Sequence, residues 1–574
     1  MSNNIAWEQV DWAAVRYRVS RYQYRIYKAS LNSKKAKVRF LQKQLLSSLD
    51  SKLYAVFSVT TWNKGKKNPG VDKNFYMTNK HKMSLVQDLR LDGKTVPFKS
   101  IWIPKEGEKE KSSLCIPIIK DRAKQTLFLL ALEPEWEARF ESNSYGFRPG
   151  KSCHDAIEAI LFALGNKSKK VESKYILDVD LSKCFSSLNH EYLIKKIDSL
   201  PEVNKQLESW LKYGMIKDCE IKLCESIVFN KLFQEKGRIL YAFLVNVALH
   251  GMQNHLKDWI NNYSILSSYA NKGKKEKQKS LSVIRYTDNC VIIHPSKKTL
   301  ILAKEEISKW LKETSGLEFK NTKNSISLSA EGFNFLGFSF IMVNQNSILR
   351  YKAYPSREAQ KKILYKVRDI IQTNRNVSAY VLITKLKPVI IGWANYYRYC
   401  ECKETFAKLT HLIFKKLKSW VFRRDTRNGR QKVKEKYFPS GQTYTFDGVK
   451  HEDNWVFYGE CRDKRNEIRK AWLPHLVWVK SRKWVKVKGK ASVYDGNNAY
   501  WAQRSMKYSY WNFSERYLIY RQKGYCSYCK GKIMSNDLCK VDNIMLSSLG
   551  GRHIQSNKQL IHIECYLSKT STNT

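Results

Sequence analysis

The chain has 574 residues, and its 103 lysines and arginines against 52 aspartates and glutamates give a formal net charge of +51. This length exceeds what one hydrophobic core usually organises, and so large a positive charge indicates a polyanionic partner, above all nucleic acid. The 13 cysteines are too scattered for a secreted disulfide framework, and no apolar run reaches the roughly 18 residues that span a bilayer. We therefore expect no membrane partner and a reducing compartment.

The first hundred residues have a mainly helical pattern that is interrupted by a basic loop, in which Lys64, Lys66 and Lys67 precede Pro69 and Gly70. Beyond residue 110, strand-like and helical patterns alternate, which predicts a mixed α/β region. The strand-like runs span residues 175–181, 283–294 and 333–340.

A basic amphipathic helix is predicted further along the chain. Apolar residues at helical spacing between Phe406 and Trp420 form one face, and the lysines, including Lys415 and Lys416, lie mostly off it. The following region is aromatic and rich in loops, and the last fifty residues carry a Cys/His pattern. We divide the chain into five parts: 1–110, 111–345, 346–437, 438–520 and 521–574.

Acidic residues stand on two of the predicted strands. Asp178 and Asp180 are two residues apart and so share one face of a strand, and Asp288 lies at the expected tip of a hairpin. Carboxylates on two neighbouring strands can hold the two Mg²⁺ ions of nucleotidyl transfer. Taken singly, each strand is more typical of a solvated turn aspartate, so spacing alone leaves both interpretations open.

Several longer segments bear on this choice: Asn63–Asp72, Leu132–Phe140, Asn143–Asp155, Val247–Met252, Gly332–Phe338 and Leu386–Arg398. In them the chain resembles bacterial and organellar group II intron-encoded proteins, which are reverse transcriptases and maturases. The resemblance implies a multidomain α/β protein. Its first two parts would be the fingers and palm of a right-hand reverse transcriptase, and the third a linker and an α-helical thumb, the maturase X domain. A DNA-binding-like region and a small zinc-stapled module similar to HNH endonucleases would follow.

By this resemblance Asp180 and Asp288 are the catalytic residues and the ligands of any Mg²⁺ ion, but the polymerase motifs are incomplete. Asn289 stands where the family's Tyr-Ala-Asp-Asp motif has its second acid. The family's Pro-Gln-Gly and Arg-Pro-Leu-Gly motifs read Glu235-Lys-Gly and Ser112-Ser-Leu-Cys. Because a neutral amide cannot replace a carboxylate beside divalent metals, we expect that polymerase activity is lost. The alternative is an active RNA-directed DNA polymerase that copies its intron into DNA.

The C-terminal part has the pairwise spacing of a structural zinc site, with ligands Cys526, Cys529, His562 and Cys565. Free thiols are the alternative. Around these residues the chain resembles an HNH endonuclease, but it has Asn543 and Tyr566 where that family uses histidines. Asn543 cannot act as a general base, so we expect a zinc-bound remnant without DNA cleavage.

The surface for nucleic acid is expected on basic and aromatic residues, because cations neutralise phosphates and rings stack on unpaired bases. For the aromatic residues taken singly, core packing is the more common alternative. The resemblance implies group II intron RNA as partner, with a DNA target and a homodimer as further possibilities. It also favours a plastid (chloroplast) over a bacterial cytoplasm. The predicted RNA-binding residues are Lys64, Lys66, Lys67, Arg148, Trp393, Tyr396, Tyr397, Arg398, Lys415 and Lys416.

Overall fold

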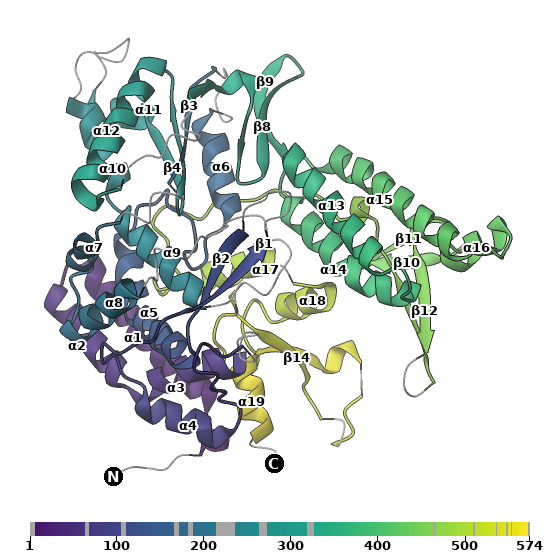
Figure 1. Cartoon of the computed structure of the whole chain (residues 1–574), viewed down its shortest axis with the longest axis horizontal. Helices are drawn as coiled ribbons and strands as arrows, with labels where there is room; N and C mark the ends of the chain where they lie inside the picture. The colour runs from purple at the N-terminus through teal and green to yellow at the C-terminus, as the bar shows by residue number, and fades with distance from the viewer. Residues whose placement is uncertain are drawn as a thin grey trace.

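A computed structural model gives the fold of the chain (Figure 1). It describes residues 6–62, 68–104, 111–165, 172–181, 188–213, 236–262, 273–317, 326–462, 466–508, 511–534, 537–546, 549–552 and 554–571.

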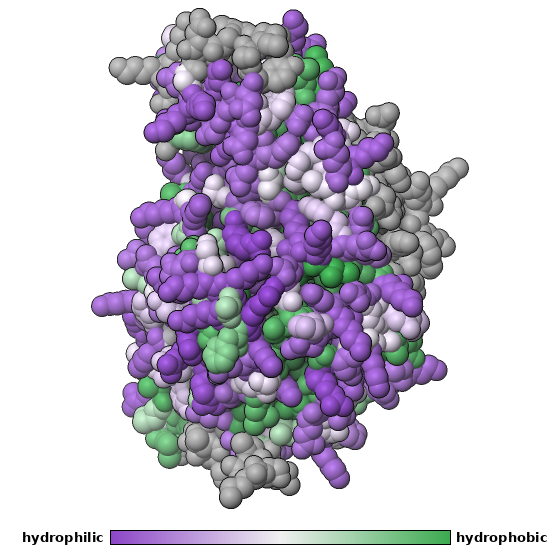
Figure 2. All heavy atoms as spheres, turned by 90° about the vertical axis from the view of Figure 1, so that its left-hand side faces the viewer, coloured by the Kyte–Doolittle hydropathy of each residue, from purple (hydrophilic) through white to green (hydrophobic). Residues whose placement is uncertain are grey.

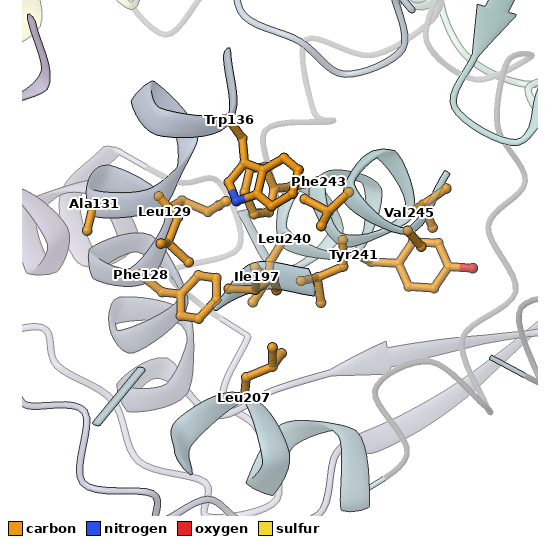
Figure 3. Close-up of a cluster of buried hydrophobic side chains, with 14 of the residues drawn as sticks. Phe128, Leu129, Ala131, Trp136, Ile197, Leu207, Leu240, Tyr241, Phe243 and Val245 are labelled. Atoms are coloured by element: carbon orange, nitrogen blue, oxygen red, sulfur yellow. The ribbon is translucent and has the colours of Figure 1, made fainter. Parts of the chain in front are cut away.

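The N-terminal half of the molecule is built around one long buried helix, α5 (Ile119–Arg139), against which α1, α2, α3 and α9 pack. Helix α1 begins after Asp11, whose carboxylate accepts hydrogen bonds from the first free backbone N–H groups. Figure 3 shows how apolar side chains of α5, α7, α8 and α9 converge on this core. The other bounds are α1 (Trp12–Leu31), α2 (Lys35–Ser47), α3 (Leu49–Phe57), α4 (Asn79–Asp88), β1 (Lys99–Pro104), β2 (Lys111–Ile116), α7 (His190–Ile197), α8 (Pro201–Lys212) and α9 (Lys236–Ala248).

A four-stranded antiparallel sheet with the order β4-β5-β3-β6 follows the helical region. Because side chains alternate across a strand, the sheet serves two cores: Leu177 and Ile292 join the N-terminal core, whereas Ile176 and Ile293 join a second core. Helix α12 packs on β3 and β5, and α6 packs on β4. The bounds are α6 (Cys153–Ala163), β3 (Tyr175–Asp180), α10 (Met252–Asn262), α11 (Lys274–Ser280), β4 (Ser282–Tyr286), β5 (Asn289–His294), α12 (Lys297–Ser315) and β6 (Ile326–Leu328).

A three-stranded sheet leads into a group of helices that projects to the right in Figure 1. The predicted basic helix is confirmed as part of α15, with Leu409, Ile413 and Leu417 buried. The hairpins β10–β11 and β12–β13 come after these helices. The bounds are β7 (Phe333–Phe335), β8 (Phe338–Gln345), β9 (Ile348–Pro355), α13 (Arg357–Thr373), α14 (Ala379–Tyr397), α15 (Lys403–Arg424), α16 (Arg430–Tyr437), β10 (Thr443–Phe446), β11 (Val449–Glu452), β12 (Tyr458–Arg462) and β13 (Ile468–Trp472).

The C-terminal part returns to the N-terminal helices, and α19 packs against α1 at the bottom of Figure 1. The remaining elements are α17 (Asn498–Tyr508), α18 (Phe513–Arg521), β14 (Cys539–Asn543), β15 (Lys558–His562) and α19 (Ile563–Ser571). Figure 2 shows that hydrophilic side chains dominate the face carrying α2, α7 and α12. Within the described residues, no helix is long and apolar enough to cross a membrane.

Two predicted strands differ from the structure in detail. The 283–294 run forms β4 and β5, which turn at Thr287 and Asp288, so the expected hairpin tip is confirmed. The 333–340 run was expected to be one strand but forms β7 and β8. Leu336 and Gly337 break it because both adopt positive φ, 50° and 79°, which suits a tight two-residue turn.

Candidate functional site

The expected carboxylate pair meets at the edge of the four-stranded sheet. Asp180 ends β3 and lies directly across from Asn289 at the start of β5. The backbone N–H of Leu181 donates to the carbonyl of Asp288 (3.0 Å), which ties the hairpin tip to the end of β3. The structure therefore brings Asp180, Asp288 and Asn289 together at one point.

Asp288 is nearly inaccessible to solvent, with 4% of its surface exposed. Burial, with a smaller contribution from the nearby charge of Asp180, raises the pKa of Asp288 to about 7. The Asn289 side-chain amide donates a hydrogen bond to Asp288 Oδ1 (3.0 Å). Asn289 therefore stabilises its neighbour as a hydrogen-bond donor and adds no negative charge for a metal ion.

The hairpin tip rests on the loop that contains Gly146. Thr287 has φ of 58°, an uncommon conformation for a β-branched residue, and a Cβ on Gly146 would lie 2.1 Å from Thr287 Oγ1. Asn246 of α9 donates to the Gly146 carbonyl (2.7 Å) and accepts from buried Arg285 (3.1 Å). Only a glycine at position 146 lets the loop approach the tip this closely.

The predicted RNA-binding residues Lys64, Lys66 and Lys67 lie outside the described residues, and so does Glu235 of the altered Pro-Gln-Gly motif. For Ser112 to Cys115 the structure describes the backbone, as part of β2. Asp180 and Asp288, the predicted Mg²⁺ ligands, both lie among the described residues.

The four predicted zinc ligands form a compact cluster. The ligand atoms of Cys526, Cys529, His562 and Cys565 all lie within 4.8 Å of one another, and Nδ1 of His562 faces the sulfurs of Cys529 (3.4 Å) and Cys565 (3.8 Å). The Gly531 N–H points to the Cys529 sulfur (3.4 Å). Three thiolates and one imidazole are the donor set of structural zinc sites, so these residues fit a zinc ion.

A carboxylate and an arginine stand behind the histidine of this cluster. Asp537 Oδ2 lies 3.3 Å from His562 Nε2 and 2.7 Å from Arg16 Nη2 on α1. A carboxylate on the far nitrogen is how proteins commonly orient a metal-binding histidine. No pattern in the sequence indicates this pair, because Arg16 and Asp537 are 521 residues apart and neither belongs to a motif.

The residues around the cluster form two strands and a helix, β14, β15 and α19. Asn557 fixes the intervening loop by bonding the backbone of Met545 in both directions (2.9 Å each). The Lys540 ammonium lies 3.5 Å from the ring centre of Tyr566. Lys569 donates to Asp542 (2.7 Å) and to the Asn543 carbonyl (2.6 Å). Two lysines thus occupy the space beside Asn543 and Tyr566.

The aromatic residues predicted to bind RNA are buried. Trp393, Tyr396 and Tyr397 on α14 are 2–4% exposed, and their rings pack on Phe338 and Phe406. This geometry supports the core-packing interpretation. The motif joins α14 to the three-stranded sheet instead of presenting rings to solvent.

Arg148 and Arg398 are also buried, which argues against direct RNA contact by either. Arg148 makes a bidentate pair with Glu137 (2.7 and 2.9 Å) and donates to two backbone carbonyls. Arg398 donates to the Lys480 carbonyl (2.9 and 3.1 Å). Because their donors bond within the protein, both side chains brace the fold. Lys415 is exposed and Lys416 half-buried, so these two remain accessible to a partner.

A second buried polar contact that no motif in the sequence indicates joins α6 to the region after the hairpins. Asp155 of α6 is fully buried, and its Oδ1 accepts from Trp484 Nε1 (3.0 Å), Val487 N (2.9 Å) and Arg504 Nη2 (2.9 Å). Its second oxygen accepts from Ser152 N (2.8 Å). One carboxylate therefore fixes the region after the hairpins to the palm side of the molecule.

Comparison with known families matches three stretches of the chain. Residues 7–89 match the N-terminal domain of reverse transcriptase, residues 103–340 match reverse transcriptase (RNA-dependent DNA polymerase), and residues 360–438 match the group II intron maturase-specific domain. The four-stranded sheet is therefore the palm of a reverse-transcriptase-like fold, and the helices of the third stretch form its thumb.

Curated relatives agree with these matches. Maturase-like protein 1 of Euglena gracilis is 28% identical over 410 residues, covering 70% of this chain and 78% of the relative. Protein YkfC of Escherichia coli (strain K12) is 26% identical over 306 residues, covering 49% of this chain and 78% of the relative. Group II intron-encoded protein LtrA of Lactococcus lactis subsp. cremoris is 23% identical over 347 residues, covering 52% and 56%. The chain belongs to the group II intron-encoded reverse transcriptase and maturase family.

Proposed function

We propose that this chain is a maturase that binds its intron RNA and promotes ribozyme folding and splicing, while its polymerase and endonuclease sites no longer react. The palm hairpin carries the proposal: Asn289 lies across from Asp180 and donates a hydrogen bond to Asp288. The hairpin strands and the thumb share one hydrophobic core, and Asn289 is not among the residues of that core. RNA binding therefore survives where polymerase chemistry does not.

The proposed mechanism is population shift. Folding brings the phosphates of RNA helices together, and a protein of formal net charge +51 offsets their repulsion. A protein that binds the folded ribozyme more tightly than its other conformations shifts the population toward it. The RNA then performs both transesterifications, and the protein makes no bond.

Loss of the polymerase follows from charge. Two-metal transfer needs carboxylates that hold both ions and offset their charge. Here the neutral Asn289 stands at the third position, and burial together with Asp180 raises the pKa of Asp288 to about 7, so that in the absence of metal this carboxyl is only partly ionised near neutral pH. Asp180 and Asp288 could still bind one Mg²⁺ ion without supporting synthesis.

Loss of the endonuclease follows from the C-terminal module. Its four predicted zinc ligands lie together, but Asn543 offers no base, and the ammonium groups of Lys540 and Lys569 occupy neighbouring space. A divalent cation bound beside them would be repelled. In this proposal the module is a zinc-stapled structural unit, and contact with a DNA target and homodimer formation stay predictions.

The proposed compartment is a plastid. Lys- and Asn-rich usage and the similarity to proteins of Euglena gracilis and Euglena longa support this choice over a bacterial cytoplasm.

The decisive experiment measures splicing of the intron that surrounds the reading frame, at low, near-physiological Mg²⁺, with and without the purified chain. We expect faster splicing with protein, and the same acceleration from Asp180→Ala because the palm carboxylates play no part. Binding of intron transcripts no tighter than of an arbitrary RNA of equal length, at moderate salt, would contradict the proposal. Template-dependent cDNA synthesis that disappears in Asp180→Ala would instead establish the active polymerase.

A further inference from the structure

A pocket that no motif identifies lies between the β10–β11 hairpin, the segment around Lys480 and helix α18. Its volume is about 510 Å³, within the range of roughly 300–1,000 Å³ that is usual for small-ligand sites. It lies outside the residues matched to the reverse-transcriptase and maturase models, which end at residue 438.

The charge of this pocket favours an anion. Three cationic side chains line it, Lys480, Arg482 and Arg516, against one carboxylate, Asp447. Arg516 already makes a bidentate pair with Asp447 (2.9 and 2.8 Å). Lys480 and Arg482 are exposed, and their side chains have no partner within the described part of the chain. Two uncompensated cations therefore remain at the rim.

The walls of the pocket are aromatic. Tyr517 and Tyr520 of α18 are 49% and 67% exposed, and they line the pocket together with Phe446 and Trp478. Trp478 is held in place by stacking on His451, with ring centres 4.3 Å apart. Aromatic faces beside arginines bind unpaired nucleobases by stacking, and the cations take the adjoining phosphates.

The pocket is fixed to the end of the maturase helix α14. Buried Arg398, which ends the thumb motif, donates to the Lys480 carbonyl, and the Arg482 N–H donates to the Arg398 carbonyl (2.8 Å). Arg398 thus places one wall of the pocket. Arg398 can therefore support RNA binding by positioning the pocket, without contacting RNA itself.

We propose that this pocket binds an unpaired nucleotide of single-stranded RNA, stacking its base on Tyr517 or Tyr520 and pairing its phosphate with Lys480 and Arg482. The choice of RNA over DNA rests on the proposed maturase function and on the attachment of the pocket to the thumb. The pocket adds a defined single-strand contact to the general electrostatic attraction of the basic surface.

The test compares the full chain and single variants by fluorescence anisotropy with a labelled oligouridylate of about 12 nucleotides, within the usual span of single-strand sites. We expect Arg482→Ala and Tyr520→Ala to weaken binding about tenfold, and Tyr520→Phe to bind like the unchanged chain. Lys483→Ala is the matched control, because Lys483 is exposed next to Arg482 but does not line the pocket. It should weaken binding by no more than about twofold.

Equal losses for Arg482→Ala and Lys483→Ala would overturn the proposal, since charge alone would then explain binding. So would losses seen with oligothymidylate but not with oligouridylate, which would make this a DNA pocket. An unchanged melting temperature in each variant shows that the fold is retained. The maturase function is tested separately by splicing. If the chain accelerates splicing but the pocket variants bind oligouridylate as well as the unchanged chain does, only the pocket proposal is refuted. If the pocket variants lose oligouridylate binding but the chain shows no preference for intron RNA, only the maturase function is refuted.

Discussion

Zinc affinity should depend on an arginine at the opposite end of the chain from the zinc ligands. Arg16 on α1 holds Asp537 (2.7 Å), which in turn faces Nε2 of His562 (3.3 Å). Removing a carboxylate that orients a metal-binding histidine typically costs 10–100-fold in metal affinity. Asp537→Asn should therefore weaken zinc binding by about 10–100-fold, or about 1.4–2.7 kcal/mol.

Arg16→Ala should weaken zinc binding too, and it should also loosen the contact between α1 and α19. Arg16 lies 3.4 Å from Glu564, whose side chain is fully buried, so its removal leaves two carboxylates without their cation. Breaking a buried pair in this way costs about 3–5 kcal/mol. Arg18→Ala is the matched control, because Arg18 also lies on α1 but pairs with Asp50 of α3 at the protein surface. Such surface pairs contribute at most about 1 kcal/mol.

Competition with a chromophoric zinc chelator gives the affinities, and hydrogen exchange of α19 reports the contact. We expect weakened zinc binding in Asp537→Asn and Arg16→Ala, faster exchange in Arg16→Ala, and neither change in Arg18→Ala. Equal zinc affinity in all four proteins would refute the argument that Asp537 positions His562. Zinc loss in Arg18→Ala as severe as in Arg16→Ala would show that any change on α1 is enough.

Three further changes test the palm and its braces. Asp155→Asn should lower the free energy of unfolding by about 3 kcal/mol, because buried Arg504 loses its charged partner; urea denaturation measures this. His294→Phe should reduce acid sensitivity. Burial lowers the pKa of His294 from 6.5 to about 4, so the unfolded chain takes up the proton first, and stability falls by about 3 kcal/mol as pH drops from 6.5 to 4; denaturation across this window measures the slope. Asn289→Asp should lower the melting temperature without Mg²⁺ and make it rise on adding Mg²⁺, because a third carboxylate repels its neighbours until a cation binds; calorimetry with and without Mg²⁺ measures this.

Each of these three predictions has an outcome that would contradict it. An Asp155→Asn chain as stable as the original would mean that its three donors find other acceptors. Unchanged acid sensitivity in His294→Phe would place the titrating group elsewhere. If the melting temperature of Asn289→Asp does not change when Mg²⁺ is added, the hairpin no longer forms a metal site even with its third acid restored.

Local patterns in the sequence predicted the groups that lie close together in the chain or in known motifs. Asp180 and Asp288 meet as expected because strand alternation and a hairpin fix their faces. The four predicted zinc ligands come together because each pair is short in sequence: Cys526 and Cys529 are joined by a turn, and His562 ends β15 while Cys565 lies in the first turn of α19. Such contacts follow from spacing, which a sequence displays directly.

The braces could not be predicted in this way. Asp155 and Arg504 are 349 residues apart, and nothing near either residue indicates the other. Arg148 and Trp393 show the opposite problem, since basic and aromatic residues in a nucleic-acid-binding chain suggest a surface, and only the tertiary structure shows that they are buried. Composition identified the partner class, whereas burial decided which residues could reach it.

The proposed loss of polymerase chemistry is physically separable from the fold of this chain. Asn289 has nearly the shape of aspartate, keeps the strand pairing with Asp180, and gives Asp288 a hydrogen bond in place of a repelling charge. With the pKa of Asp288 already raised to about 7 by burial and by Asp180, a third carboxylate would destabilise a palm that holds no metal. The thumb rings and the Arg148 brace draw their stability from other contacts. An amide at this one position can therefore remove a carboxylate that synthesis needs and still leave a palm stable enough to carry the thumb.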